Sequence, residues 1–482
     1  MIRGHKGFKS RKTYLFIMVL LTILFCKPSM DDECDPFGEK NKSTILLRTL
    51  LGDNSVFCGK ASSSLSNKVI VAATQFQCPS DSVPIVNGSS VSMQVTTNGT
   101  ELNYSISSDL PAGLTLDKSS GKITGSYTAY KGFFKDYTIT ASNSLGTASC
   151  TFTPKFMGKL PFTTNITSCW DSSGTSDPTC TSPVGQDGSL RIGTTRDFTG
   201  PTLVGSDTIT KDNITGLTWT SCNMGQSDIN CLTGSANTYT LSTAQAACSS
   251  LDSANSGAGY ANLKGWRVPE REEYPHIINL AVSNPPVFSA YFPQTISYNY
   301  KTNTIPPNSP GNTWYPTLIE GAYGAGSFTD GHYLRCVTNT FDSTKRLLDN
   351  QNGTVTDLNT SLVWQKCSVG FSNVTNCTGG SATPSNWLTA MNTCNSLSLA
   401  GRTWRLPNAR ELESLVDFYR TPDPATVNPT YFPNTSTGNY YWTSSTTVTA
   451  PTNAWFVGFG AGEHSYMLKS TNTLFTRCVS SF

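Results

Sequence analysis

The chain has 482 residues, a length that predicts about three domains, each large enough to bury its own core. Lysine and arginine (34 together) nearly balance aspartate and glutamate (32 together), so no basic field points to nucleic acid as a partner. Fifteen cysteines and a charged fraction of only 14% indicate a β-rich, exported protein, because cytosolic thiols are kept reduced.

Residues 1–25 are expected to be a secretory signal peptide. Five basic residues and no acid precede an apolar run, Tyr14–Phe25, that is too short to cross a bilayer of ~30 Å as a helix. The run leads into Cys26 in a sequence that resembles a bacterial lipobox, whose cysteine is lipid-modified, although Phe25 stands where a small residue is usual. We expect a lipid anchor at Cys26 and a lipoprotein of the bacterial cell envelope, exposed on the outer membrane. The alternative is cleavage near Cys26 and secretion.

A polar N-terminal segment, residues 26–78, carries Cys34 and Cys58 and predicts no particular fold. From residue 79 to residue 156, short runs alternate apolar and polar residues. Such runs predict half-buried β-strands, which are separated here by turns that contain glycine.

Three motifs in this strand-rich region carry a resemblance. Leu110–Asp117, Ser120–Gly125 and Tyr137–Gly146 occur in order, and together they resemble an Ig-like domain family of bacterial surface proteins. The resemblance implies a small β-sandwich that serves as a spacer, to which we assign no site. Cys78 and Cys150 would join two edges of that sandwich.

Residues 157–186 are rich in proline and small polar residues, which predicts a linker in which Cys169 and Cys180 close a small loop. Beyond the linker, one four-cysteine pattern occurs twice, with successive gaps of 9, 17 and 88 residues and then of 10, 17 and 84 residues. Random cysteines do not repeat their spacing, so residues 187–340 and 341–482 are a tandem duplication, copy 1 and copy 2. The two sets are Cys222, Cys231, Cys248 and Cys336, and Cys367, Cys377, Cys394 and Cys478.

Each copy is expected to open with a β-hairpin whose second strand ends on a tryptophan, Trp219 or Trp364. A helix follows the hairpin. Ser242 and Gln245 predict a capping box for it in copy 1, and Ser385 is expected to start the equivalent helix in copy 2. The last third of each copy is rich in predicted strands.

A second helix is expected after a Trp-Arg-Val/Leu-Pro motif. In copy 2, Asn408 caps this helix and Glu411 stands three residues later. In copy 1, Glu273 occupies the matching position, but Pro275 removes a backbone donor and should shorten or kink the helix.

The order and content of each copy resemble the Lcl C-terminal domain family of bacterial surface proteins. The resemblance rests on Trp404–Pro407, Tyr441–Ser445, Ala454–Val457 and Arg477–Val479 of copy 2. Copy 1 is looser, with Asn312–Pro316 in place of the Trp-Thr-Ser-Ser strand.

This resemblance implies a variant of the C-type-lectin-like fold. The expected architecture is therefore α+β and β-rich, a small Ig-like β-sandwich followed by two disulfide-stapled, lectin-like domains. In lectin-like domains the first helix is tied to the final strand. The resemblance thus implies the disulfides Cys248–Cys336 and Cys394–Cys478, with Cys222–Cys231 and Cys367–Cys377 closing short loops.

Catalytic chemistry finds little support in the sequence. The four histidines are scattered, and no metalloprotease, paired-cysteine or nucleophile-elbow motif occurs. His332 and His464 stand at roughly matching positions and are interpreted as surface polar residues. Arg267 and Arg405 are interpreted as structural, bonding loop carbonyls or an acidic side chain. We expect no catalytic residue, no cofactor and no metal, since the late loops lack the oxygen cluster that calcium-dependent sugar binding needs.

Aromatic residues on the late strands supply the candidate ligand surface, because rings can stack on sugars or on a protein partner. Alternation also predicts that about half of these rings point into the core. We expect a non-enzymatic, adhesin-like lipoprotein whose two lectin-like modules bind an extracellular protein or glycan with shared avidity. The alternatives are an enzyme on the formylglycine-generating form of the lectin-like superfold, and a purely structural envelope protein. The candidate surface comprises Tyr441, Trp442, Trp455, Trp314 and Tyr315.

Overall fold

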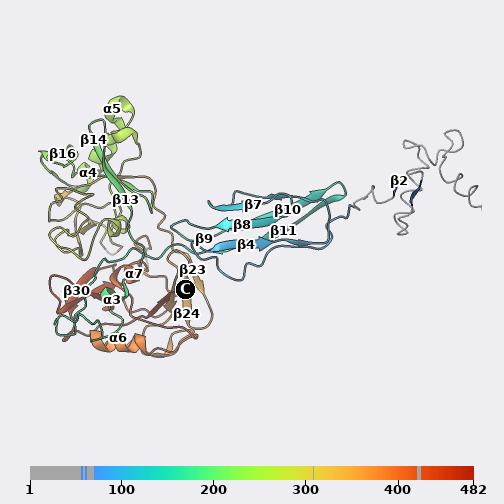
Figure 1. Ribbon diagram of the computed structural model, residues 1–482. Helices are drawn as coiled ribbons and strands as arrows, with labels where there is room; N and C mark the ends of the chain where they lie inside the picture. The colour runs from blue at the N-terminus through green and yellow to red at the C-terminus, as the bar shows by residue number, and fades with distance from the viewer. Residues whose placement is uncertain (1–55, 58–59, 62–69, 308, 421–424, 482) are drawn as a thin grey trace, which may run out of the picture. The chain divides into compact units, whose positions relative to one another are not determined.

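The computed structural model describes residues 56–57, 60–61, 70–307, 309–420 and 425–481. Cys26, Cys34 and Cys58 lie outside the described residues, as does the expected signal peptide, so these expectations remain predictions. Figure 1 shows a strand-rich chain with few helices, in which the Ig-like strands are blue to teal and the two repeated domains run from green to red. Both repeated domains and most of the Ig-like strands belong to one compact unit, formed by Gln77–Thr96, Tyr104–Thr140 and Ser149–Phe482.

The Ig-like region consists of short strands that bury alternate side chains, as the sequence predicts. In β10 (Tyr137–Asn143), Tyr137, Ile139 and Ala141 are buried while the residues between them are partly exposed, because successive side chains of a strand point to opposite faces. One sheet has the strand order β11-β10-β6, and an antiparallel sheet has the order β4-β8-β7. The other strands of this part of the chain are β1 (Val56–Phe57), β2 (Lys60–Ala61), β3 (Phe76–Gln77), β4 (Ser90–Gln94), β5 (Thr96–Thr97), β6 (Asn103–Ile106), β7 (Leu114–Leu116), β8 (Lys122–Ser126), β9 (Phe133–Phe134), β11 (Gly146–Phe152) and β12 (Lys155–Phe156).

Each repeated domain is built on a four-stranded antiparallel sheet that joins the beginning of the copy to its end. The strand orders, β13-β14-β15-β22 and β23-β24-β25-β31, are equivalent. The last strand pairs with the strand that carries the predicted hairpin tryptophan, Trp219 opposite Val337 and Trp364 opposite Val479. Both tryptophans are fully buried and belong to the large core to which both copies contribute.

The strands of the two copies have the following bounds. Copy 1 contains β13 (Phe198–Val204), β14 (Asp207–Asp212), β15 (Thr218–Thr220), β16 (Gln226–Ser227), β17 (Thr233–Gly234), β18 (Thr238–Tyr239), β19 (Asn312–Pro316), β20 (Tyr323–Ser327), β21 (His332–Tyr333) and β22 (Val337–Thr338). Copy 2 contains β23 (Leu347–Asp349), β24 (Thr354–Asp357), β25 (Leu362–Gln365), β26 (Phe371–Asn373), β27 (Thr378–Gly380), β28 (Tyr440–Thr446), β29 (Asn453–Gly458), β30 (His464–Leu468) and β31 (Val479–Ser481).

Disulfides connect the elements of both copies in the pattern that the sequence implies, and no described cysteine is free. In each copy one bridge ties the first helix to the segment before the last strand, and a second closes a short hairpin. The long bridges restrict the unfolded chain most, because they close loops of 88 and 84 residues. The pairs are Cys78–Cys150, Cys169–Cys180, Cys222–Cys231, Cys248–Cys336, Cys367–Cys377 and Cys394–Cys478.

The first helices begin one or two residues away from the predicted starts. In copy 1, Thr240 caps α4 (Leu241–Ser250) and accepts a hydrogen bond from the backbone N–H of Thr243. The capping box predicted at Ser242 is therefore wrong. In copy 2, Asn386 rather than Ser385 caps α6 (Trp387–Asn395). Each cap is the last residue with extended backbone angles, which is what the N-cap position requires.

The second helices follow the predictions closely. In copy 2, Asn408 and Glu411 form the predicted capping box at the start of α7 (Ala409–Glu413). In copy 1 the equivalent element is a short 3₁₀ helix, η4 (Arg271–His276), and it contains Pro275. Other short helices are α3 (Asp187–Leu190), η2 (Leu251–Ser253), α5 (Ala254–Gly257) and η3 (Tyr260–Asn262).

The predicted alignment of the late strands is wrong in copy 1. The hydroxyl of Thr302 donates to the carbonyl of Trp314, just as Thr443 donates to Trp455. Asn312–Pro316 is therefore the counterpart of β29, and the counterpart of β28 is the irregular segment around Thr302. Lys301 occupies the position of Trp442, which explains why no second aromatic strand was recognisable in the sequence.

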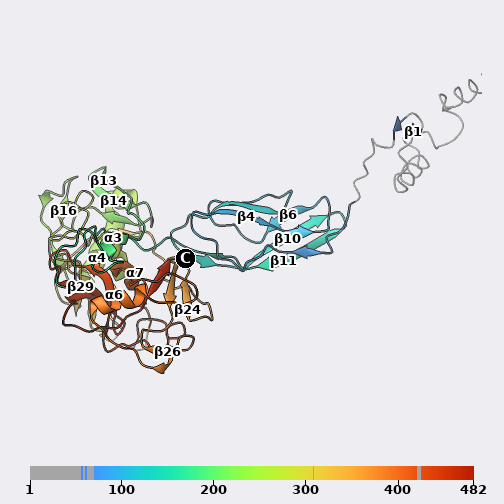
Figure 2. The same ribbon diagram turned by 60° about the horizontal axis from the view of Figure 1, so that its bottom comes forward.

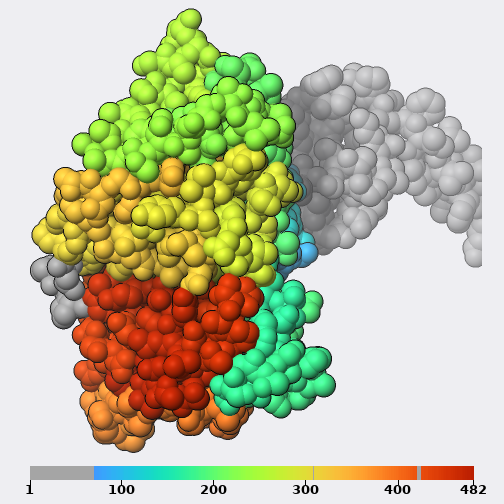
Figure 3. Space-filling view, turned by 90° about the vertical axis from the view of Figure 1, so that its left-hand side faces the viewer, coloured from blue at the N-terminus to red at the C-terminus, as the bar shows by residue number. Residues whose placement is uncertain are grey.

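The segment predicted as a linker is an ordered part of the double domain. Thr164, which lies within the predicted linker, donates a hydrogen bond to the carboxylate of Asp187 (2.6 Å). The same carboxylate accepts a hydrogen bond from Ser445 of copy 2 (2.5 Å). The side-chain amide of Asn408 donates to the carbonyl of Ile192 (3.1 Å). Figure 3 shows this teal-green segment lying against the red surface of copy 2. Burial raises the pKa of Asp187 to about 6, even though both hydroxyls favour the ionised form.

Candidate functional site

The aromatic residues of the expected ligand surface lie mostly in the core. Tyr441 and Trp442 have no exposed surface, Trp455 is 2% exposed and Trp314 is 3% exposed. Only Tyr315 is partly accessible. The expectation that about half of these rings point into the core is met by Trp442 and Trp455, and Tyr441 and Trp314 are buried as well. Of the candidate ligand surface only Tyr315 is left.

The late strands of copy 2 are covered by the helix of their own domain on one face and by the sister copy on the other. Trp442 packs with Trp387 of α6 in a core that belongs to copy 2 alone. Trp314 and Trp455 lie on the opposite side, in one large core that both copies share. Figure 3 shows the yellow surface of copy 1 lying directly against the red surface of copy 2. The sister copy therefore occupies the face on which a ligand was expected.

The copies pack on each other with approximate twofold symmetry. The ring centroid of Trp314 in copy 1 lies 6.2 Å from that of Phe418 in copy 2. The equivalent residues, Trp455 of copy 2 and Leu280 of copy 1, line one small cavity on the other side of the interface. Phe418 and Leu280 stand at the same distance along the chain from the Trp-Arg-Val/Leu-Pro motif. Reciprocal contacts of this kind characterise a twofold interface.

Tyr323 and His464 lie where the pseudo-twofold axis passes. They open β20 and β30 at equivalent positions, opposite Pro316 and Val457 in the preceding strands. Their ring centroids are 5.9 Å apart. A residue meets its own counterpart only close to a twofold axis, so this contact locates the axis.

The predicted equivalence of His332 and His464 is wrong. His332 pairs with Tyr239 in β18, and its counterpart is Leu474, which is bridged to Ser385. Both histidines are also buried, at 5% and 0% exposed, and not surface residues as predicted. Burial lowers the pKa of His464 to about 3 and that of His332 to about 4, so both rings are neutral at ordinary pH.

A buried ion cluster spans the interface beside this axis. Glu413 of copy 2 accepts from Arg271 of copy 1 (2.9 Å) and from Arg410 of its own helix (2.7 Å). Arg271 is fully buried, donates also to the carbonyl of Gly462, and packs its guanidinium 3.9 Å from the ring centroid of Tyr323. Burial raises the pKa of Glu413, but the two guanidinium groups outweigh it and lower the pKa to about 2.

A cavity of about 70 Å³ adjoins this ion cluster. It lies between the equivalent helices η4 and α7, and residues at matching positions face it from the two copies. These matching pairs are Glu272 with Arg410, Pro275 with Glu413, and His276 with Ser414. No motif in the sequence points to this site, because helices of two different copies meet there and a sequence does not show which helices are neighbours.

The arginines of the Trp-Arg-Val/Leu-Pro motif have the structural role that was expected of them. Arg405 binds both carboxylate oxygens of Glu411, at 2.6 and 2.7 Å. Arg267 binds Glu273 in the same two-point manner, at 2.5 and 2.8 Å. Each glutamate also accepts from the backbone N–H of its helix cap, so these four side chains fix the entry to the second helix.

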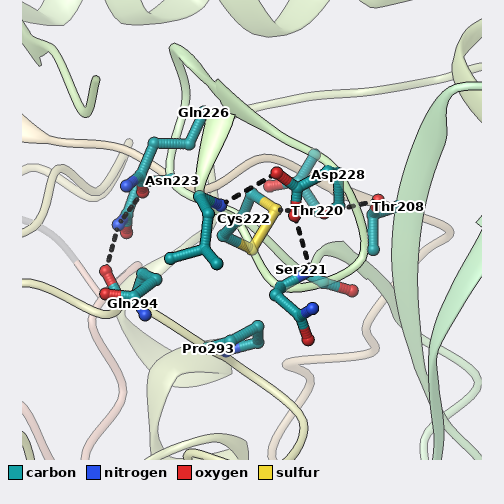
Figure 4. Close-up of a disulfide and its surroundings, with 12 residues drawn as sticks. Thr208, Thr220, Ser221, Cys222, Asn223, Gln226, Asp228, Pro293 and Gln294 are labelled. Carbon is teal, nitrogen blue, oxygen red and sulfur yellow. Dashed lines mark hydrogen bonds between the residues drawn. A yellow bond between two sulfur atoms is a disulfide. The ribbon is translucent and has the colours of Figure 1, made fainter. Parts of the chain in front are cut away.

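The short disulfides close exposed β-hairpins at the outer ends of the two copies. Figure 4 shows the Cys222–Cys231 bridge, with the backbone of Asp228 bound by the hydroxyl of Thr208. The carboxylate of Asp228 holds the turn by accepting from the backbone of Asn230 and Thr233. In copy 2, Asn373 plays this part beside Cys367–Cys377. Leu232 at the tip of the copy 1 hairpin is 66% exposed.

The described residues contain neither a candidate metal site nor a candidate membrane-spanning helix. Across these residues, no group of three or more histidine, cysteine, aspartate and glutamate side chains is placed to share a metal ion. No helix in the same residues has the length and apolar character needed to cross a membrane.

Solved structures with similar features match only weakly. The Yersinia pseudotuberculosis adhesin InvE is 8% identical over 86% of this chain and 99% of its own, with a TM-score of 0.19. The SusE-like surface polysaccharide-binding protein BT4661 of Bacteroides thetaiotaomicron is 12% identical over 85% of this chain and 60% of its own, with a TM-score of 0.15. An alpha-galactosidase-like protein of Bacteroides fragilis is 17% identical over 20% of this chain, with a TM-score of 0.15, and this chain spans only 22% of it. Scores this low carry no conclusion about fold or function.

Family comparisons are more informative, although no curated protein matches the sequence. Residues 71–156 match the family described as "Putative Ig domain". Residues 208–338 and 353–480 each match the Lcl C-terminal domain, and these two matches together cover more than half of the chain. The protein therefore belongs to the Lcl C-terminal domain family and carries that domain twice.

Proposed function

We propose that this protein is a non-enzymatic lipoprotein of the bacterial cell surface, anchored through Cys26, whose paired Lcl C-terminal domains bind an extracellular protein or glycan. The observation that carries the proposal is the construction of the paired domains. A shared core joins two copies of one domain into a single body, and within each copy a disulfide ties the first helix to the segment before the last strand. A body of this kind suits ligand binding outside the cell, where disulfides persist.

The outer hairpins are the surfaces that we assign to the ligand. The aromatic strands are covered by the sister copy, whereas β16–β17 and β26–β27 are largely exposed. Each hairpin is closed by a disulfide and pinned by side chains, so little conformational entropy is lost when it binds. The hydroxyl and amide groups along them are suited to hydrogen bonding with sugars or with a peptide backbone.

A binding array tests the proposal. The oxidised mature protein should bind a defined subset of extracellular glycans or matrix proteins. Binding should fall when the hairpin tip is altered by Leu232→Ser, and it should persist in Leu145→Ser, a change at an equally open site in the Ig-like region (59% exposed). Binding that is lost equally in both variants, or no binding to any member of the array, would count against the proposal.

The anchor and the absence of catalysis need separate tests. Metabolic labelling with a palmitate analogue should mark the wild-type protein and leave Cys26→Ala unlabelled. Every described cysteine is paired, so thiol counting on the oxidised protein should find no reactive thiol among these residues. A reactive cysteine found by thiol counting would instead favour an enzyme that uses a thiol nucleophile.

A further inference from the structure

The cavity between η4 and α7 is lined by more positive than negative side chains. The cationic side chains are Lys131, Lys159, Lys345, Arg271 and Arg410, and the acidic ones are Glu272, Asp357 and Glu413. Such an excess inside a partly enclosed space attracts an anion, because charge interacts more strongly there than in water.

The acids of the cavity are already engaged by other groups. Glu413 is bound by the two arginines, and Glu272 accepts from the amine of Lys345 at 2.9 Å. Asp357 accepts from the hydroxyl of Thr360 at 2.7 Å and from a backbone N–H. Glu413 and Glu272 thus have cationic partners of their own, whereas the donors to Asp357 are neutral and leave its charge uncompensated. Two lysines of the cavity, Lys131 and Lys159, remain against that one carboxylate.

Lys131 carries one of these two remaining charges. Within the described chain its amine has no carboxylate partner and no hydrogen-bond acceptor, and it lies over the ring of Phe341 at 4.6 Å from the centroid. Burial, aided by the positive charge of Lys345, lowers its pKa to about 8. Two more donors at the cavity are unused, since the Nε atoms of Arg271 and Arg410 are buried without an acceptor. Buried donors of this kind normally have partners.

The size of the cavity limits what can supply those acceptors. A volume of about 70 Å³ is open to the centres of water-sized molecules, and one water needs roughly 10–15 Å³ of such space. The cavity therefore has room for several water molecules or for one small oxyanion. An oxyanion of that size would supply both negative charge and several acceptors, whereas water supplies acceptors alone.

We propose that this cavity is a binding site for one small oxyanion group, a carboxylate, phosphate or sulfate, held by Lys131 together with the arginines of the interface. The site contains residues of both copies and of the Ig-like region, so an occupant would bind only when these parts are assembled. This inference is independent of which extracellular ligand the hairpins take. The oxyanion is either free in solution or part of a larger molecule.

Titration of the mature protein with acetate, phosphate or sulfate tests this site, using sodium chloride at equal ionic strength as the reference. At least one oxyanion should raise the unfolding midpoint above the chloride reference and give a saturable isotherm by calorimetry. Lys131→Gln should weaken that affinity at least tenfold, and Lys131→Arg should retain it. Lys118→Gln, at an exposed lysine of the same Ig-like region, is the matched control and should change nothing.

Circular dichroism in chloride shows whether each variant is folded before it is titrated. If Lys131→Gln does not fold, selenate soaked into crystals of the wild-type protein should give anomalous density in the cavity. Stabilisation equal to that by chloride, an unchanged affinity in Lys131→Gln, or water alone in the cavity would overturn the proposal. A larger ligand that carries the group would compete with the free ion for the same site.

Discussion

Tyr323 and His464 occupy equivalent positions in the two Lcl C-terminal domains and pack against each other, with ring centroids 5.9 Å apart. The contact places the axis of an internal pseudo-dimer at the core that both copies share. Gene duplication has thus produced one body with a twofold interface inside a single chain, rather than two separate modules on a tether.

Neutralising Glu413 should destabilise the pair of domains strongly. Glu413→Gln leaves Arg271 and Arg410 buried without their shared anion, and breaking a buried pair in this way costs about 3–5 kcal/mol. The free energy of unfolding from urea titration measures the loss. Asp342→Asn removes the acid of a more exposed pair with Arg346 and should cost less than about 1 kcal/mol. Equal effects of the two changes would contradict the central role of the interface ion cluster.

Trp455 should behave as a core residue and not as a ligand contact. Trp455→Ala removes a ring that is 2% exposed and should lower the free energy of unfolding by about 3–5 kcal/mol. Leu232→Ala, at the exposed hairpin tip, should change stability by less than about 0.5 kcal/mol. A Trp455→Ala protein of normal stability that had lost only its ligand binding would restore the aromatic surface as the binding site.

The two kinds of disulfide should differ in what they contribute. Cys394–Cys478 spans 84 residues and Cys367–Cys377 spans 10. Loop-closure entropy predicts that replacing both cysteines of the long bridge by alanine costs about 4–5 kcal/mol, and about 3 kcal/mol for the short one. Urea unfolding under non-reducing conditions compares the two double variants. A larger loss from the short bridge would show that local strain or hairpin packing dominates over chain entropy.

Asp187 should make stability depend on pH between about 4 and 6. Burial raises its pKa to about 6 in the folded protein, whereas an unfolded aspartate titrates near ~3.9. Protonated Asp187 therefore gives the folded protein its full stabilisation below the pKa of the unfolded state. This stabilisation, up to about 3 kcal/mol, is lost as the pH rises through about 6. Unfolding free energies measured at several pH values should show this decline.

Asp187→Asn supplies the control for that pH dependence. Asparagine keeps an acceptor for Thr164 and Ser445 but cannot ionise. The variant should lose the decline between pH 4 and 6 and should be more stable than the wild type at pH 7 to 8. An unchanged pH profile in Asp187→Asn would assign the dependence to other groups.

Local chemistry in the sequence predicted the elements of each domain well. The repeated cysteine spacing identified the duplication, and the resemblance to lectin-like domains implied the bridges that the structure contains, including Cys248–Cys336. The Asn408–Glu411 capping box and the disruption of the matching helix at Pro275 also follow from short-range rules. Such features depend on residues a few positions apart, and a single sequence displays them directly.

Features that depend on the partner of a surface could not be predicted. The sequence shows that Trp455 belongs to an apolar run, Ala454–Val457, but it does not show whether the face that carries Trp455 is covered by the same domain, by the sister copy or by water. The same limit explains why Arg271 and Glu413, 142 residues apart in sequence, were not recognised as a pair. Asn312–Pro316 was aligned with β28 of copy 2 because its Trp-Tyr-Pro sequence resembles the aromatic residues of that strand. Its true counterpart is the next strand, β29.

The internal axis has a consequence for what the protein can hold. A half-turn relates each patch of copy 1 to its counterpart on copy 2, and Figure 2 shows the hairpin strands β16 and β26 at opposite ends of the double domain. If both hairpins bind as we propose, one ligand gains from both sites only when it reaches from one end of the double domain to the other. Shorter ligands would each occupy a single hairpin.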